Sequence, residues 1–436
     1  MANLPVRIVI AGLGTVGMGV IRMLHRNQEN IAARCGGNIE IVGICETDPR
    51  RRPPPEFADV PVSADAARFL DDPAVDIFVE LIGGVGAARE YVLKALDCGK
   101  HVVTANKALL AQHWDEIFAV ARRHGCGVRF EAAVMAGVPI IRGLHEGLAG
   151  NAITSITGIL NGTTNFILTQ MESRNLSFAE ALEAARTRGL CERDASLDID
   201  GHDATHKLSV LGSLAMGQWL PPQRIYTEGI RNIDHCDITY AAEQFGYRLK
   251  LLAIFKEHDG QIEARVHPTF VRNDHPLASV GDAFNAALIQ ADAAGPVMLY
   301  GLGAGEQPAA SGVVSDIISL ARAVTAGVRG PSLLPAGIRD GIATVRPMAD
   351  VQCKFYLRIE TLDRPGVLSA IAGALGRRQV SIASVYQRGR AATGSVPVLL
   401  VTHEAREGAV QEALKEIAAA EFTQSPPVLI RIEEPD

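Results

Sequence analysis

One short acidic segment of the chain holds the side chains best suited to proton transfer. Between residues 192 and 207 it contains five carboxylates and one lysine: Glu192, Asp194, Asp198, Asp200, Asp203 and Lys207. Such a run is most often a solvated face or a capped helix start, and the D-x-D-x-D-G spacing of a calcium loop is not met. An ammonium beside a carboxylate can, however, donate a proton to an aldehyde oxygen as hydride arrives, and accept one from an alcohol.

The residues that follow predict that two of these side chains share one face of a helix. ATHKLSVLGSLAM, residues 204–216, has the apolar period of a largely buried helix. Asp203 and Lys207 are four residues apart and therefore meet on its first turns. A buried lysine needs a partner, because burial otherwise drives it neutral. The spacing alone leaves catalysis and a structural ion pair as equal alternatives.

A glycine-rich turn near the start of the chain predicts a dinucleotide site. Gly12, Gly14 and Gly17 fit G-x-G-x-x-G between the apolar strand VRIVIA (6–11) and an apolar-periodic helix. The first glycine allows the tight turn, the second lets backbone approach a pyrophosphate, and the third lets the helix pack on the strand. The phosphates would lie at the helix N-terminus. A mere tight turn is the alternative, and the position after a buried strand counts against it.

The end of the second expected strand, Ile39–Ile44, bears on the choice of cofactor. Glu46 or Asp48 could accept hydrogen bonds from a ribose 2′-hydroxyl and select NAD. The three arginines at 50–52 follow at once and could equally accommodate the 2′-phosphate of NADP. The sequence leaves this choice open, with a slight preference for NAD.

Strands and helices alternate around the glycine-rich turn. Further strands are expected at 76–82, 100–104 and 127–131, with helices at 86–98 and 107–124. Such alternation is typical of a parallel sheet with crossover helices. The sequence therefore predicts an α/β fold whose dinucleotide-binding domain, residues 1–138, is a Rossmann-like doubly wound parallel sheet. A helix near 306–325 is expected to complete it.

Two further domains are expected after this one. Longer helices and Thr-rich strands, including Ala152–Leu160, predict a central α+β domain over 139–305 for substrate binding and dimerisation. A connector over 328–341 follows. The chain then closes with a βαββαβ-like unit, which predicts a ferredoxin-like domain over 350–433.

The composition excludes several classes of protein. The 436 residues are 47% hydrophobic and 21% charged, enough for two or three buried cores. A formal charge of −7 gives no basic footprint for nucleic acid, and no apolar run is long enough to span a bilayer. Seven scattered cysteines, never paired as CxxC, suit reduced thiols. With no signal-peptide pattern at the start, we expect a cytoplasmic protein.

Seven motifs, taken in order, resemble those of the homoserine dehydrogenase family. They are GLGTVG (12–17), VELIGG (79–84), TANKALLA (104–111), FEAAVMAGVPII (130–141), GILNGTTNFILT (158–169), DIDGHDATHKL (198–208) and YGLGAGEQPAASGVVSDI (300–317). The resemblance covers about residues 5–320. It implies an NAD(P)-dependent enzyme of threonine and methionine biosynthesis that interconverts L-homoserine and L-aspartate 4-semialdehyde, as a homodimer or homotetramer.

The same resemblance implies roles for individual residues. Lys207 matches the catalytic lysine, Asp203 its neighbour in the substrate pocket, and Lys107 a second lysine near substrate and nicotinamide. Glu192 would bind the amino-acid end of the substrate, and Asp198 would line the same region. The expected cofactor contacts are Gly12, Gly14, Thr15, Val16, Gly17, Glu46, Thr104, Lys107, Gly303 and Gly305. Without the resemblance, Lys107 would more often be a surface lysine at a helix start.

The family also has a monovalent cation, such as Na⁺, held by backbone carbonyls in the turn after the fifth strand. The matching carbonyls belong to Glu131, Val134, Ala136 and Val138. Met135 and Ala136 stand where the family usually has glycines, and side chains there are expected to alter the backbone conformation of the turn. The tyrosine and proline that the family has around Glu192 are also missing here.

The last part of the chain resembles an ACT domain. LDRPGVLSAIAGAL (362–375) followed by VSIASVYQ carries this resemblance, with Asp363 near a helix start. It implies pairing between subunits and feedback inhibition by an amino acid, with threonine as the expected effector. An ACT unit retained only for assembly is the alternative.

Two other functions remain to be tested. A semialdehyde dehydrogenase would need a nucleophilic cysteine with a histidine partner, a setting that Cys191 and Cys236 lack, although two histidines follow Cys191 in the sequence. A catalytically degenerate amino-acid sensor would retain only the ACT function. The intact Lys207, Glu192 and complete G-x-G-x-x-G count against the sensor.

Overall fold

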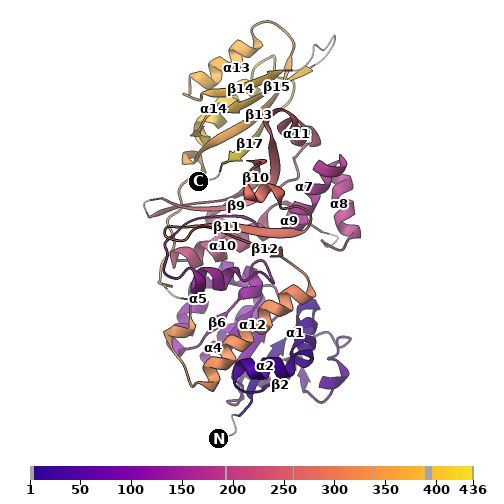
Figure 1. Cartoon of the computed structure of the whole chain (residues 1–436), viewed down its shortest axis with the longest axis vertical. Coiled ribbons are helices and arrows are strands. Elements are labelled where there is room, and N and C mark those ends of the chain that lie inside the picture. Colours follow the sequence, from indigo (N-terminus) through magenta and orange to yellow (C-terminus); the bar gives the residue numbers. More distant parts are fainter. Residues whose placement is uncertain (1–3, 192–193, 259, 336, 388–394, 435–436) are drawn as a thin grey trace. The chain divides into compact units, whose positions relative to one another are not determined.

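The computed structural model describes residues 4–191, 194–258, 260–335, 337–387 and 395–434 (Figure 1). The chain divides into two compact units, each built from three segments. The first unit comprises residues 1–156, 203–225 and 284–343, and the second comprises 157–202, 226–283 and 344–436. Within the described ranges, no helix combines the length and the apolar character that a membrane crossing needs.

A six-stranded parallel sheet forms the centre of the first unit. Its strands are β1 (Val6–Ala11), β2 (Ile39–Cys45), β3 (Val62–Ser63), β4 (Ile77–Glu80), β5 (His101–Thr104) and β6 (Val128–Arg129). They lie in the order β3-β2-β1-β4-β5-β6, and every neighbouring pair is parallel. The order reverses beside β1, and ligands of such sheets bind at the carboxyl ends of the strands near this reversal. The predicted Rossmann-like sheet is confirmed.

Helices from both ends of the first unit cover this sheet. They are α1 (Thr15–Arg26), α2 (Gln28–Cys35), α3 (Ala67–Leu70), α4 (Gly86–Asp97), α5 (Lys107–His124) and α12 (Glu306–Thr325). The late helix α12 lies beside α1 (Figure 1), and the two helices share one core with the apolar side chains of β1. A Cβ on Gly19 of α1 would lie 3.1 Å from the Cβ of Ala310, so glycine permits this close packing.

The remaining elements of the first unit follow the sheet. They are α6 (Ile140–Arg142), α10 (His202–Met216, within the unit from Asp203) and the antiparallel hairpin of β11 (Phe284–Ala291) and β12 (Gly295–Leu302). Strand β7 (Ile153–Ile159) begins in the first unit and ends in the second. Helix α10 is buried along most of its length, as its apolar period predicts.

Before its C-terminal part, the described residues of the second unit form four α-helices and three strands that lie wholly within it. They are α7 (Gly162–Arg174), α8 (Phe178–Thr187), α9 (Ser196–Ile199), α11 (His235–Tyr240), β8 (Tyr226–Thr227), β9 (Tyr247–His258) and β10 (Gln261–Arg272). Strand β9 pairs with the whole of β10 in antiparallel register. Strand β8 pairs in parallel with Arg265 and Val266 of β10.

A ferredoxin-like unit closes the chain. Its elements are β13 (Gln352–Leu362), α13 (Val367–Gly376), β14 (Ile382–Gln387), β15 (Ser395–Thr402), β16 (Ala405–Arg406), α14 (Glu407–Ala418) and β17 (Val428–Glu433). The main strands lie in the order β17-β13-β15-β14, and α13 and α14 share an apolar core with them. The outer strand β17 also pairs in parallel with Thr269–Val271 of β10. The predicted βαββαβ pattern is confirmed.

Candidate active site

Lys207 and Asp203 form the predicted ion pair on helix α10. The ammonium nitrogen of Lys207 lies 2.7 Å from Oδ2 of Asp203, one helical turn away. Both side chains are buried, with relative exposures of 7% and 4%. Asp203 lies in the first turn of the helix, where the helix dipole also favours a negative charge. The pair thus places a lysine against a carboxylate within a nearly dry environment.

The other oxygen of the same carboxylate holds a second lysine. Nζ of Lys107 lies 3.1 Å from Oδ1 of Asp203, and 33% of the Lys107 side chain is exposed. Lys107 is the first residue of α5 and directly follows the carboxyl end of β5. One buried carboxylate therefore lies between two ammonium groups, and the Lys107 side is open. Residue spacing did not predict this contact, because the two residues belong to distant segments; only the family resemblance implied that both lie near the substrate.

Three buried polar residues, Glu80, Thr104 and Asn106, fix the conformation of the backbone next to Lys107. Glu80 ends β4 with no exposure, and its carboxylate accepts a hydrogen bond of 2.5 Å from the hydroxyl of Thr104. The backbone N–H of Asn106 donates to the hydroxyl oxygen of Thr104. The side-chain oxygen of Asn106 caps α5 by accepting from the backbone N–H of Leu109. Burial raises the pKa of Glu80. Glu80 and Asn106 were missed as site residues; a carboxylate inside the apolar run IFVE was the available signal.

The glycine-rich turn fits a dinucleotide. A Cβ on Gly12 would lie 2.5 Å from the carbonyl oxygen of Leu81, and one on Gly17 only 2.0 Å from that of Gly12. A Cβ on Gly14, by contrast, would meet only the guanidinium of Arg51, at the ordinary contact distance of 3.8 Å. In this part of the structure no side chain caps α1, as expected where phosphates bind the first amide groups. Thr15 and Val16 form the first turn of α1.

The side chain of Glu46 binds the backbone of the glycine-rich turn instead of facing outward. Its carboxylate accepts hydrogen bonds of 2.8 Å from the amides of Leu13 and Asp48, and lies 3.6 Å from Arg51. Burial disfavours its charge, but these hydrogen bonds and Arg51 outweigh burial and hold the pKa of Glu46 below its usual value. The guanidinium of Arg51 therefore stands between Glu46 and the open side of Gly14.

The other carboxylates of the acidic segment have separate structural partners in the second unit. Asp194 accepts from the amide of Ser196 at the start of α9, and Asp200 pairs with Arg231 at 2.5 Å. Asp198 accepts a hydrogen bond of 2.7 Å from the side chain of Asn161, the N-cap of α7. Asp194 and Asp200 thus fit the structural alternative. Glu192 lies outside the described residues.

The turn of the expected cation site keeps the conformation that glycine favours. Met135 and Ala136 both have positive φ, 56° and 45°, and are buried. Both L-residues therefore lie in the left-handed region, which strains the backbone of the turn. Among the carbonyls proposed as ligands, those of Glu131 and Val138 accept amides of Val134 and Ile140.

The side chains of the described residues offer no alternative metal site. The residues that the structure describes include no group of three or more His, Cys, Asp or Glu able to hold an ion. The carboxylate of Glu131 faces the start of α6, where it accepts from the amides of Ile141 and Arg142. Burial, reinforced by Asp316, raises the pKa of Glu131 to about 7. A cation at this turn would depend on carbonyl oxygens alone.

Gly303 and Gly305 have structural reasons to be glycine. A Cβ on Gly303 would lie 2.1 Å from the side chain of Asn285, and Gly305 has φ +116° just before α12. These constraints place the backbone at the start of α12, and contact with a cofactor remains a prediction.

The cysteines do not resemble nucleophiles. All seven are free thiols. Burial raises the pKa of Cys236 to about 12, and burial also raises that of Cys191. A nucleophilic cysteine needs a lowered pKa, so the environment of both thiols opposes the cysteine mechanism.

Comparisons with known proteins agree on one family. The model for the homoserine dehydrogenase NAD-binding domain matches residues 12–131, the homoserine dehydrogenase model matches 139–318, and the ACT domain model matches 355–419. Homoserine dehydrogenase of Pseudomonas aeruginosa is 42% identical over 99% of both chains. That of Neisseria gonorrhoeae is 41% identical over 98% of this chain and 99% of its own.

Solved structures give the same result. The crystal structure of a homoserine dehydrogenase from Thiobacillus denitrificans has a TM-score of 0.92 at 40% identity, covering 99% of each chain. A hyperthermophilic archaeal homoserine dehydrogenase in complex with NADPH has a TM-score of 0.61 at 30% identity, over 73% of this chain and 98% of its own.

Proposed function

The chain belongs to the homoserine dehydrogenase family, and on that premise we propose that it interconverts L-homoserine and L-aspartate 4-semialdehyde through Lys207, Lys107 and Asp203. It is an oxidoreductase that acts on a CH–OH group. The observation that carries the residue assignment is the Asp203 carboxylate, which lies within 2.7 Å of Lys207 and 3.1 Å of Lys107. This cluster belongs to the same unit as the glycine-rich turn.

Lys207 is the proton-transfer group in this proposal. The nicotinamide cofactor, when bound, supplies or accepts the hydride. In reduction, the ammonium of Lys207 donates a proton to the aldehyde oxygen; in oxidation, its amine accepts the hydroxyl proton. Asp203 orients this ammonium and stabilises its charge, since it lies 2.7 Å away in a buried site.

Lys107 orients the reacting oxygen from the open side. Its side chain is partly exposed and is tied at its tip to Asp203. The frame of Glu80, Thr104 and Asn106 fixes the backbone from which Lys107 extends. Glu192 and Asp198 are proposed to bind the ammonium of the substrate's amino-acid end, with Asn161 holding the carboxylate of Asp198 in place.

We further propose that NADP is preferred over NAD. The carboxylate of Glu46 is occupied by the amides of Leu13 and Asp48, whereas Arg51 lies beside the open face of Gly14. A guanidinium in this position suits a 2′-phosphate. The archaeal relative was solved with NADPH. This reverses the slight preference for NAD given by the sequence.

Threonine is proposed as a feedback effector of the ACT domain. A cavity of about 540 Å³ lies at the turn Asp363–Leu368 and is large enough for an amino acid. Threonine should inhibit the wild type and lose potency against Asp363→Ala.

The finer proposals that follow from the family are a homodimer or homotetramer, a cytoplasmic location and a Na⁺ ion on the carbonyls of Glu131, Val134, Ala136 and Val138.

A spectrophotometric assay tests the main proposal. L-homoserine is supplied with NADP⁺ or NAD⁺, and the absorbance of the reduced cofactor is followed. The wild type should reduce NADP⁺ with the higher kcat/KM, and the Lys207→Ala variant should be nearly inactive. Absence of turnover with both cofactors would contradict the function, and turnover that requires phosphate and is stopped by thiol reagents would favour the cysteine mechanism.

A further inference from the structure

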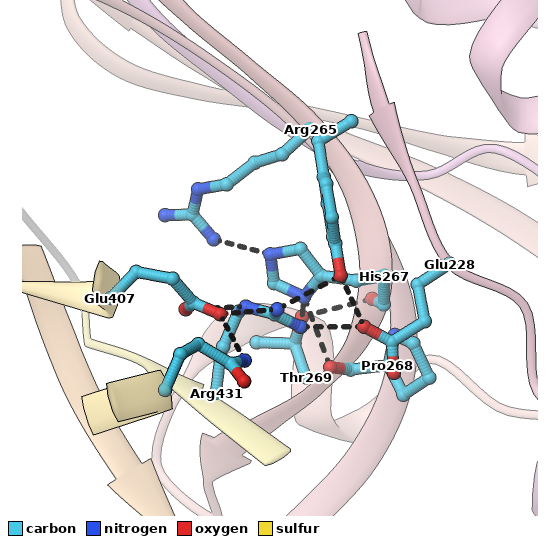
Figure 2. A network of polar contacts seen from close by, with 9 residues as sticks. Glu228, Arg265, His267, Pro268, Thr269, Glu407 and Arg431 are labelled. Atoms are coloured by element: carbon cyan, nitrogen blue, oxygen red, sulfur yellow. Dashed lines mark hydrogen bonds and ion pairs between the residues drawn. The ribbon is translucent and has the colours of Figure 1, made fainter. Parts of the chain in front are cut away.

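A buried arginine links the C-terminal ferredoxin-like unit to strand β8 within the second unit. Arg431 of β17 is 1% exposed, and its guanidinium makes a two-point contact with Glu407 of α14 at 2.7 and 2.9 Å. It also donates to Glu228 at 2.7 Å and to the hydroxyl of Tyr226 at 3.1 Å. Figure 2 shows this guanidinium between Glu407 and Glu228. Arg431 therefore contacts side chains of α14 on one side and of β8 and the residue after it on the other.

The deeper part of the same network is closed. Arg265 of β10 donates to Glu263 at 2.7 Å and to Glu433 at 2.8 Å, and lies 2.7 Å from a ring nitrogen of His267. His267 has no exposure; burial, together with the two arginines, holds its pKa well below its usual value and keeps the ring neutral. These groups are satisfied by one another, so any ligand must approach from the Glu228 side.

An open cavity of about 330 Å³ lies on that side. Glu228 and Tyr226 form one wall, Gln411, Leu414 and Lys415 of α14 form the other, and Arg431 lies at its base. Its apolar lining is completed by Ala418, Pro427 and Leu429. The volume is at the small end of known ligand sites, so it suits a molecule of amino-acid size. It is separate from the cavity at Asp363–Leu368, with which it shares no lining residue.

Polar groups of both signs face this space with capacity to spare. Glu228 uses only Oε2 for Arg431 and Tyr226, and its Oε1 accepts no hydrogen bond from the described residues. Lys415 is exposed and forms no ion pair with any part of the chain that the structure describes. The formal charges of Arg431 and Lys415 balance those of Glu407 and Glu228. A ligand with a single net charge would upset this balance, whereas a zwitterion would not.

We propose that this cavity, called here the β8–α14 cavity, binds a small neutral α-amino acid as a zwitterion. The carboxylate of the ligand pairs with Lys415, and its ammonium pairs with Oε1 of Glu228. Its apolar side chain lies against Leu414, Ala418 and Leu429. No covalent step is involved, and the inference does not depend on the proposed dehydrogenase activity, because binding is measured directly.

The backbone next to Glu228 contacts the acidic segment, so binding in the cavity can affect that segment. Glu228 is followed by Gly229, where a Cβ would lie 2.2 Å from the carbonyl oxygen of Ile199. The amide of Ile230 donates to the same carbonyl at 2.8 Å. Ile199 belongs to α9, the helix that also contains Asp198. A ligand that pulls on Glu228 therefore acts on the backbone that positions Asp198.

Calorimetric titration of the full chain tests the proposal. The probes are L-alanine, L-valine and L-threonine, with isobutyrate and isobutylamine as molecules that lack one of the two charges. Two exposed alanines near the end of α14 provide a matched pair, since Ala418 lines the cavity and Ala419 does not. At least one amino acid should bind the wild type, with affinity reduced about tenfold or more in Ala418→Trp and Lys415→Ala. Ala419→Trp should bind as the wild type does.

Four results would overturn the proposal. One is that no amino acid binds at millimolar concentration. Another is that Ala418→Trp, shown to be folded by thermal unfolding, binds every probe as tightly as Ala419→Trp does. The third is that Gln387→Trp, which fills the other cavity, abolishes all binding, because the ligand would then belong to the turn at Asp363–Leu368. Equal affinity for isobutyrate and L-valine would exclude recognition of the zwitterion.

Discussion

Two of the buried charge clusters in the described part of the chain, one from each compact unit, have opposite arrangements. In the first, the carboxylate of Asp203 lies between the ammonium groups of Lys207 and Lys107. In the second, the guanidinium of Arg431 lies between the carboxylates of Glu407 and Glu228. Both place one charge between two opposite ones, and each has one accessible end, since the side chains of Lys107 and Glu228 are 33% and 41% exposed. They differ in the cation, which is lysine in the first cluster and arginine in the second.

This difference distinguishes a cluster with a catalytic role from one with a structural role. A cluster that must exchange a proton with a substrate needs an ionisable lysine and an approach from solvent, and the Asp203 cluster has both. A cluster that joins secondary-structure elements needs a cation that stays charged and binds several elements at once. The guanidinium of Arg431 does this with four hydrogen bonds to three side chains. Burial opposes its charge, but the carboxylates raise the pKa of Arg431 above its usual value.

Removal of Lys207 should have the largest effect. Lys207→Ala should lower kcat by about 10²- to 10⁴-fold, because the proton-transfer group is lost, with little change in unfolding temperature. Lys207→Arg is the control: it keeps the positive charge, but its guanidinium does not deprotonate, so it should remain impaired. If Lys207→Ala kept most of its turnover, the cluster would be structural like the other one.

Removal of Arg431 should break the second cluster and cost stability rather than chemistry. Arg431→Met leaves Glu407 buried without its partner and should lower the free energy of unfolding by about 3–5 kcal/mol. Denaturant titration measures this loss. The double variant Arg431→Met/Glu407→Gln should recover much of it, because the buried charge is then absent. A single variant as stable as the wild type would refute the architectural role.

Lys250 shows what a buried cation does without a carboxylate beside it. Its ammonium donates to the carbonyl of Val280 at 2.6 Å, and burial lowers the pKa of Lys250 to about 8. Between about pH 8 and the ordinary value of 10.5, the unfolded state binds more protons than the folded one, so this group makes stability rise with pH.

The variant Lys250→Met isolates this effect. The stability of the wild type relative to Lys250→Met should increase by roughly 2–3 kcal/mol across that pH window, since one pKa unit corresponds to about 1.4 kcal/mol. Denaturant titrations at a series of pH values give the difference directly. A difference that does not depend on pH would mean that Lys250 keeps its ordinary pKa.

Arg51 is an exposed charge with a proposed ligand. Arg51→Ala should raise the KM for NADP⁺ about tenfold, the cost of roughly one charged contact, and leave the KM for NAD⁺ nearly unchanged. Arg52→Ala, a neighbouring arginine with no contact to Glu46 in the described structure, serves as the matched control. Equal effects on the two cofactors would show that Arg51 supports only the fold of the turn.

The smallest effect is expected at the strained turn. Ala136→Gly relieves a positive φ of 45° but adds freedom to the unfolded chain, so the free energy of unfolding should stay equal or rise by at most about 1 kcal/mol. Thermal unfolding of the two proteins decides this. A clear loss of stability would mean that the methyl group of Ala136 contributes more by packing than its backbone conformation costs.

Local patterns made part of the site predictable from sequence. The strand–GLGTVG–helix unit and the Asp203–Lys207 pair both depend on spacings of a few residues, and both are present as expected. The contact of Lys107 with Asp203 joins α5 to α10 across a long stretch of chain, so local spacing could not predict it and only the family resemblance placed both residues near the substrate. The Arg431 cluster could not be predicted from local spacing for the same reason, since its members belong to β17, α14, β8 and the residue after β8.

The acidic segment shows where sequence reasoning can mislead. Its carboxylates are neighbours in the chain but have different partners: Asp203 pairs with lysines, Asp194 accepts from the amide of Ser196 and Asp200 pairs with an arginine. A run of one residue type therefore predicts a charged region and not a common role. The tertiary partners that divide these roles have no signature in the run itself.

The pairing of β8 and β17 along the same edge of β10 limits how this chain can be shortened or recombined. If the C-terminal residues were removed, Thr269–Val271 would lose their strand partner, and Arg265 would lose Glu433. The shortened protein would then present an open strand edge and a partly unpaired buried cation, a combination that promotes aggregation. The ferredoxin-like unit is thus not a detachable module. Chimeras that exchange it between relatives should also exchange the matching face of β10.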